Sequence, residues 1–237
     1  MHKFNRHEYV LTLPDMVKAL FQKISYLDFD SILVNGKVPS SAGKEFSQYI
    51  PEEISKEIKF QILNRLTDPE RGFVVVRNFV PKNSTVKEKI FYASIICSFI
   101  GRQFKVIEST KLWNPLGVNL EKKSHESEGV GYNCVHIDVP NTTKIPEITC
   151  LFCDTPDFNK GGKTIVSNIL KLLSLLSPDD IDICKSKVFY EGKHFGLINV
   201  GEEYMPFPII ESEYGKLYFR FSGIMIEVLH IYRKLII

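Results

Sequence analysis

A histidine and an aspartate stand two residues apart in the apolar, β-branched stretch 135–139. If this stretch is a strand, the side chains of His136 and Asp138 project from the same face, because successive side chains of a strand alternate between faces. An imidazole and a carboxylate are two of the three protein ligands of the 2-His-1-carboxylate site that holds Fe(II) in non-haem oxygenases. The pair therefore indicates half of an iron site, although H-x-D by itself often occurs by chance.

A glycine pair follows the histidine at a distance that gives the motif a context. Thr164 lies 28 residues after His136, directly after Gly161-Gly162-Lys163, and an apolar run at 148–153 stands between the two motifs. The glycine pair lacks the G-x-x-x-x-G-K frame of a phosphate loop and suits the positive φ of a tight turn.

With these residues the chain resembles the TauD/TfdA-like (clavaminate synthase-like) family of Fe(II)/2-oxoglutarate-dependent oxygenases. In that family H-x-D/E is followed by a strand and then by G-G-x-T-x-x-x-N, represented here by Gly161, Gly162, Thr164 and Asn168. The resemblance covers residues 72–182, and more loosely 187–221. It implies an α+β fold with a double-stranded β-helix (jelly-roll) core. We expect one domain over 1–237, with a helical part at 1–70 and a core at 71–237 that lacks the final strands.

The resemblance also assigns chemistry to residues. His136 and Asp138 would bind Fe(II), and the Thr164 hydroxyl would donate to a carboxylate of the cosubstrate 2-oxoglutarate. The implied activity is a dioxygenase reaction with O₂: hydroxylation, or a related oxidation of a C–H bond, in a small organic substrate such as an amino acid or a specialised metabolite. The substrate residues are open: those just before the metal strand are candidates, or are loop residues that bond their own backbone. They are Asn119, Ser127, Tyr132 and Asn133.

The second histidine of the triad, and the arginine that pairs with 2-oxoglutarate, have no clear counterpart. His194 comes too early, and His230 is followed by Arg233 only three residues later. We favour a chain shortened relative to the family, in which Fe(II) would bind weakly, over recruitment of His230 as the third ligand. The alternatives are an inactive oxygenase-fold protein or binding module without a complete metal site, and a jelly-roll enzyme that uses another metal and no 2-oxoglutarate.

Each candidate also has a purely structural interpretation. His136 can be a core histidine that bonds Asp138 or a backbone carbonyl. Thr164 can be a β-branched strand residue after a glycine turn. The motif spacing favours the metal and cosubstrate roles.

Composition excludes several other classes of protein. The 237 residues are 44% hydrophobic and 24% charged, and 30 basic against 28 acidic residues give a net charge of +2, so we expect no nucleic-acid partner. Apolar runs are too short or too broken for a membrane span, and residues 1–9 lack an apolar signal core. Five cysteines at irregular spacing indicate reduced thiols and a cytoplasmic protein. For the C-x-x-C formed by Cys150 and Cys153, we favour core packing over metal or redox work.

The elements that position these residues are expected as follows. Helical spacing predicts a helix after Pro51 through Leu66, then a buried strand over 72–79. A second helix should run from Thr85 to Ile100, with Ser84 as N-cap and Gly101 as the stop. From Lys111 the chain reads as β and loop until a helical period at 165–176. Ser177 should cap a short acidic helix, followed by strands at 187–190, 194–200 and 216–221.

Overall fold

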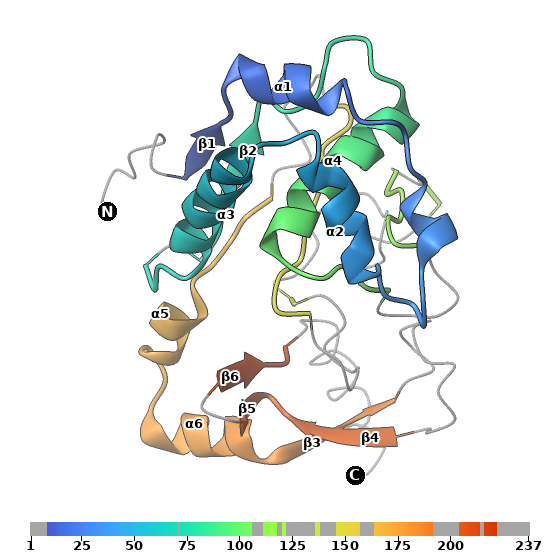
Figure 1. Ribbon diagram of the computed structural model, residues 1–237. Helices are drawn as coiled ribbons and strands as arrows, with labels where there is room; N and C mark the ends of the chain where they lie inside the picture. Colours follow the sequence, from blue (N-terminus) through green and yellow to red (C-terminus); the bar gives the residue numbers. More distant parts are fainter. Residues whose placement is uncertain are drawn as a thin grey trace. The chain divides into compact units, whose positions relative to one another are not determined.

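The computed structural model describes residues 9–70, 72–105, 111–117, 120–121, 136–137, 146–156, 164–191, 204–213 and 216–221. The chain forms two compact units. The first comprises Met1–Trp113 and Cys150–Leu170, and the second comprises Asn114–Thr149 and Lys171–Ile237. Their helices and strands (Figure 1) are β1 (Val10–Thr12), α1 (Asp15–Phe21), the 3-10 helix η2 (Phe29–Ile32), α2 (Ser40–Ser47), α3 (Glu52–Leu66), β2 (Val75–Arg77), α4 (Val86–Ile100), α5 (Ile169–Leu173), α6 (Pro178–Lys185), β3 (Lys187–Glu191), β4 (Tyr204–Pro208), β5 (Ile210–Glu213) and β6 (Lys216–Phe219).

Helices α2, α3 and α4 enclose the core of the first unit, with α4 in contact with both of the others. The ring of Phe91 on α4 centres 6.2 Å from that of Phe46 on α2 and 6.3 Å from that of Phe29. Ser94 is fully buried, yet its hydroxyl donates to the Ile90 carbonyl and accepts from the indole N–H of Trp113. The core side chains are Leu13, Val17, Phe21, Ile24, Phe29, Val38, Ala42, Phe46, Ile50, Ile58, Ile62, Phe79, Phe91, Tyr92, Ala93, Ile95 and Ile96.

The two long helices of this unit begin and end close to where the sequence places them. α3 starts after Pro51 with two glutamates in its first turn, as expected. α4 ends at Gly101 as expected, but its N-cap is Thr85 instead of Ser84. Glu88 completes a capping box with Thr85, whereas the Ser84 hydroxyl donates to the Pro81 carbonyl. The reason is spacing, because only Thr85 has a glutamate three residues later.

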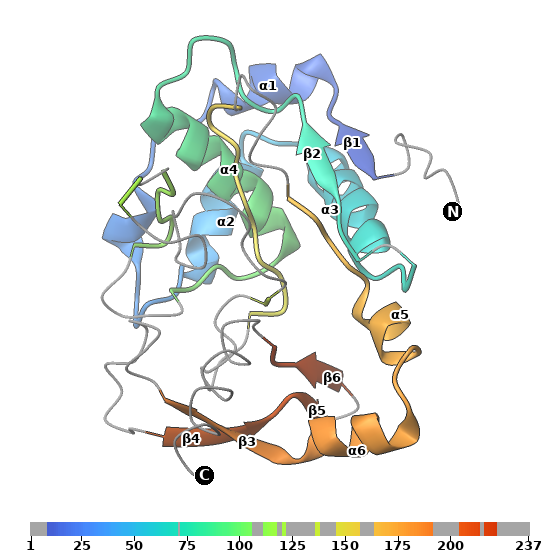
Figure 2. The same ribbon diagram turned by 180° about the vertical axis from the view of Figure 1, so that it is seen from behind.

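The strand expected over 72–79 is shorter and more exposed than predicted. β2 covers Val75–Arg77 and pairs in parallel with β1, beside α3 in both views (Figure 1 and Figure 2). Val75 is 41% exposed. The strand ends because Asn78 takes a φ of 67°, in the left-handed region, where its amide donates to the Leu13 carbonyl.

In the second unit, α6 forms as predicted, with Ser177 as its N-cap and Asp180 completing a capping box. The strands expected near 187–190 and 216–221 are present as β3 and β6. β3 pairs antiparallel with β4, and β5 with β6. The strand expected at 194–200 lies outside the described residues.

The helix expected over 165–176 is reduced to α5, Ile169–Leu173. None of its side chains is buried, and Ile165 and Val166 before it are 76% and 53% exposed. A short helix without packing is marginal in water, which explains why the helical period alone does not extend it.

The described strands form three two-stranded sheets, with no closed barrel among the described residues. The jelly roll and the single domain therefore remain predictions. None of the helices in the described ranges combines the length and the apolar character that crossing a membrane requires.

Candidate functional site

His136 lies in a β-bridge of the second unit, and its side chain is exposed. The next residue, Ile137, donates its N–H to the carbonyl of Phe221 at 2.8 Å. The backbone at residue 136 is therefore extended and in a β-bridge, in line with the strand-like sequence around it. Asp138, the other proposed ligand, lies outside the described residues.

A partly buried ion pair holds the chain just before the Phe221 carbonyl. Arg220 is 6% exposed, and its Nε lies 3.1 Å from Oε2 of Glu211 on β5. The Arg220 N–H also donates to the Ile209 carbonyl at 2.7 Å. These bonds hold the residues that directly follow β6, where the Phe221 carbonyl accepts the hydrogen bond from Ile137.

Thr164 and Asn168, from the G-G-x-T-x-x-x-N stretch, belong to the first unit. Thr164 is exposed and in no helix or strand. The side-chain amide of Asn168 donates to the carbonyl of Pro69. This hydrogen bond links the residue before α5 to the turn that follows α3. Gly161 and Gly162 lie outside the described residues.

The described candidate residues thus fall in different units, His136 in the second and Thr164 in the first. Among the described residues, no group of three or more His, Cys, Asp or Glu side chains is arranged to hold a metal ion. The exposed His136 imidazole suits one ligand position, since solvent and ions reach it. The remaining candidates lie outside the described residues: Asn119, Ser127, Tyr132, Asn133, His194, His230 and Arg233.

The core-packing interpretation of Cys150 and Cys153 is wrong. Both are exposed, and the run 148–153 forms no strand. Phe152 is the residue of this run that packs against the core of the first unit. A strand-like sequence becomes a strand only beside a partner edge, and the described residues offer none to this run.

Instead, Cys150 meets a cysteine that the sequence did not associate with it. The Sγ atoms of Cys97 on α4 and Cys150 are 3.5 Å apart, and the Cys97 thiol is the donor. This hydrogen bond lowers the pKa of Cys150 and raises that of Cys97, and burial raises the Cys97 pKa further. A separation of 53 residues gives no sequence signal for such a contact.

Comparisons with models of protein families, with curated proteins and with solved structures give no match to this chain. The resemblance to the oxygenase family therefore rests on the motif residues and their spacing.

Proposed function

We propose that this chain is an Fe(II)/2-oxoglutarate-dependent dioxygenase that oxidises a C–H bond of a small organic molecule, such as an amino acid or a specialised metabolite, in the cytoplasm. One observation carries the proposal: His136 and Asp138 are followed at the family's distance by Gly161, Gly162, Thr164 and Asn168. Either motif alone arises by chance, but their combination at this spacing is much rarer.

The local structure at His136 is compatible with a ligand role. Its backbone forms a bridge, and Ile137 is hydrogen-bonded to Phe221. The proposal requires this extended backbone to continue to Asp138, so that both side chains can face one ion. The residue is exposed, so an ion in solution can reach it.

In this proposal the protein binds and orients, and the bound Fe(II) and 2-oxoglutarate supply the oxidising chemistry. His136 would contribute an imidazole nitrogen and Asp138 a carboxylate oxygen, a mixed donor set that suits Fe(II). The Thr164 hydroxyl donates a hydrogen bond to a cosubstrate carboxylate. The third protein ligand is open: no histidine of the chain is a clear candidate, and recruitment of His230 is the less favoured possibility.

The test is the visible charge-transfer band that forms when 2-oxoglutarate chelates protein-bound Fe(II) without oxygen. The full chain should develop the band, and His136→Ala and Asp138→Ala should lose it. Thr164→Ala should keep the band but require about tenfold more 2-oxoglutarate, as expected for one lost hydrogen bond to a charged group. His194→Ala is the matched control and should leave the band unchanged.

Succinate release under air then tests turnover. Succinate that depends on 2-oxoglutarate and disappears in His136→Ala supports the oxygenase. Loss of the band in His230→Ala would identify the third ligand. A wild-type chain without the band, or a band that persists in His136→Ala, contradicts the proposal and favours the alternative of an inactive oxygenase-fold protein or binding module.

A further inference from the structure

Two free thiols from distant parts of the chain lie within contact distance in the first unit. Cys97 belongs to the last turns of α4 and is half-buried, whereas Cys150 is exposed on the segment 146–156. Their sulfurs are 3.5 Å apart. A disulfide bond is about 2.05 Å long, so the sulfurs need to approach by only about 1.5 Å.

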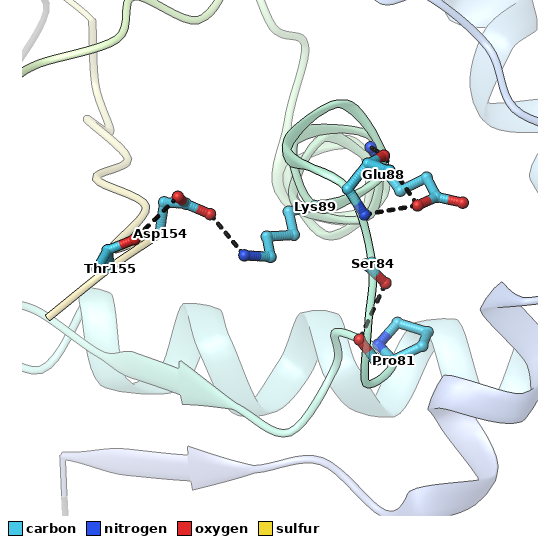
Figure 3. Close-up of polar contacts among 7 residues, drawn as sticks. Pro81, Ser84, Glu88, Lys89, Asp154 and Thr155 are labelled. Carbon is cyan, nitrogen blue, oxygen red and sulfur yellow. Dashed lines mark hydrogen bonds and ion pairs between the residues drawn. The ribbon is translucent and has the colours of Figure 1, made fainter.

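The segment that carries Cys150 is held against the same unit at two further points. Figure 3 shows the Lys89 side chain reaching from α4 to the carboxylate of Asp154, with Nζ and Oδ1 2.8 Å apart. The Phe152 ring meets that of Phe79 edge-on, with centroids 6.2 Å apart. Because these contacts already order the segment, the two sulfurs are positioned for reaction instead of meeting by random chain motion.

The two thiols are not equivalent. The S–H of Cys97 donates to Cys150, which favours the thiolate of Cys150 and lowers its pKa. The thiolate is the nucleophile in thiol chemistry, and Cys150 is also the more exposed of the two. Cys150 is therefore expected to be the nucleophile, and Cys97 the resolving cysteine that forms the disulfide with it.

We propose that Cys97 and Cys150 form a peroxide-reactive dithiol site that closes reversibly to a disulfide. The Cys150 thiolate attacks one oxygen of hydrogen peroxide, the O–O bond breaks, and a sulfenic acid forms at Cys150 as the leaving hydroxide takes up a proton to become water. The Cys97 sulfur then attacks the Cys150 sulfur, and the sulfenic oxygen leaves as a second water with the Cys97 proton. Two electrons from the thiols reduce one peroxide to two waters, and an external dithiol reverses the closure.

This site is independent of the proposed iron chemistry, because it needs neither His136 nor a metal. It also differs from the C-x-x-C suggested by the sequence. Cys153 is exposed, and no described sulfur lies in contact with it. Cys153 is therefore the matched control within the same segment.

The experiment uses the full chain, reduced and freed of reductant, then exposed to hydrogen peroxide alone. The wild type and Cys153→Ser should each lose two free thiols and two hydrogen atoms of mass, and peptide mapping should recover a peptide pair linked through Cys97 and Cys150. Cys150→Ser should lose this reaction. In Cys97→Ser, Cys150 should stop at the sulfenic acid, which a 1,3-diketone traps.

The wild-type peptide map tests the proposal even if Cys97→Ser, at a half-buried position, fails to fold. A map in which Cys97 and Cys150 both remain thiols overturns the proposal. So does a disulfide that joins Cys150 to Cys153, or peroxide-dependent thiol loss that is unchanged in Cys150→Ser.

Discussion

Helices α4 and α6 begin with the same type of N-terminal cap but differ in how many of their side chains are buried. In each, a hydroxyl N-cap and an acid three residues later form a capping box, Thr85 with Glu88 and Ser177 with Asp180. α4 buries six consecutive side chains, 91–96, whereas α6 buries none. The same start signal therefore serves a core helix in the first unit and a surface helix in the second.

The units differ in the same way. The first has a continuous apolar core, whereas the buried side chains among the described residues of the second are Ile210 and Arg220. Complete burial of a large apolar side chain contributes about 1.5–3 kcal/mol, whereas a hydrogen bond contributes about 0.5–1.5 kcal/mol net and an exposed ion pair about 0–1 kcal/mol. We therefore expect the first unit to owe its stability to packing, and the described part of the second to owe more to polar contacts.

The largest expected effect compares isoleucines on the two helices. Ile95 is fully buried on α4, and Ile95→Ala should lower the free energy of unfolding by about 2–5 kcal/mol, because it removes methylenes and leaves a cavity. Ile183 on α6 is 66% exposed, and Ile183→Ala should change the free energy of unfolding by less than about 0.5 kcal/mol. Denaturant unfolding measures the effect of both substitutions. In the first unit it is monitored by the fluorescence of Trp113, the single tryptophan. Equal losses would contradict the comparison.

The next effect concerns the partly buried ion pair of Arg220 with Glu211 in the second unit. Arg220→Ala should cost about 1–3 kcal/mol in the unfolding of β5 and β6, because it leaves the Glu211 carboxylate without its charged partner. The control is Lys56→Ala, which removes an exposed ion pair with Glu52 on α3 and should leave stability unchanged. Hydrogen exchange of the β5 and β6 amides measures the effect of Arg220→Ala. Unaltered exchange in Arg220→Ala would show that the pair is not structural.

Removing the two N-caps should have smaller effects. Thr85→Ala should cost about 1 kcal/mol, because α4 cannot fray without disturbing the core. Ser177→Ala should cost less than about 0.5 kcal/mol, because α6 can lose its first turn without exposing buried side chains. Unfolding midpoints by far-UV circular dichroism compare the two variants. A larger loss for Ser177→Ala would mean that α6 is coupled to packing outside the described residues.

The smallest effect is a dependence on pH. Hydrogen bonds from the Thr85 backbone and hydroxyl lower the pKa of Glu88, and those from the Ser177 hydroxyl and backbone lower that of Asp180. A lowered folded pKa adds stability above the ordinary value, 4.5 for Glu88 and 3.8 for Asp180, and this stability is lost as pH falls through the folded pKa. Denaturant midpoints measured at decreasing pH should fall in the wild type. They should fall less in Glu88→Gln and Asp180→Asn, and identical profiles would contradict the assignment.

The elements that the sequence predicted well are those with local causes. Pro51 followed by two glutamates begins α3, Gly101 ends α4, and Ser177 caps α6, because each signal acts on the backbone within one turn. The candidate site has a local part as well. The extended backbone at His136 agrees with its β-branched neighbours, while the distance to Thr164 is a motif spacing that leaves their relative position undetermined.

Only the tertiary structure decided the features that depend on residues distant in the sequence. The run 148–153 has the composition of a buried strand but lies exposed, apart from Phe152, because a strand needs an adjacent edge and composition cannot supply one. The contact of Cys97 with Cys150 spans 53 residues, and no periodicity encodes it. By itself the sequence determined where α3 and α6 begin, where α4 ends and which residues are candidates for iron. The fold determined which side chains are buried and which two sulfurs meet, because burial and long-range contacts depend on the packing of the whole unit.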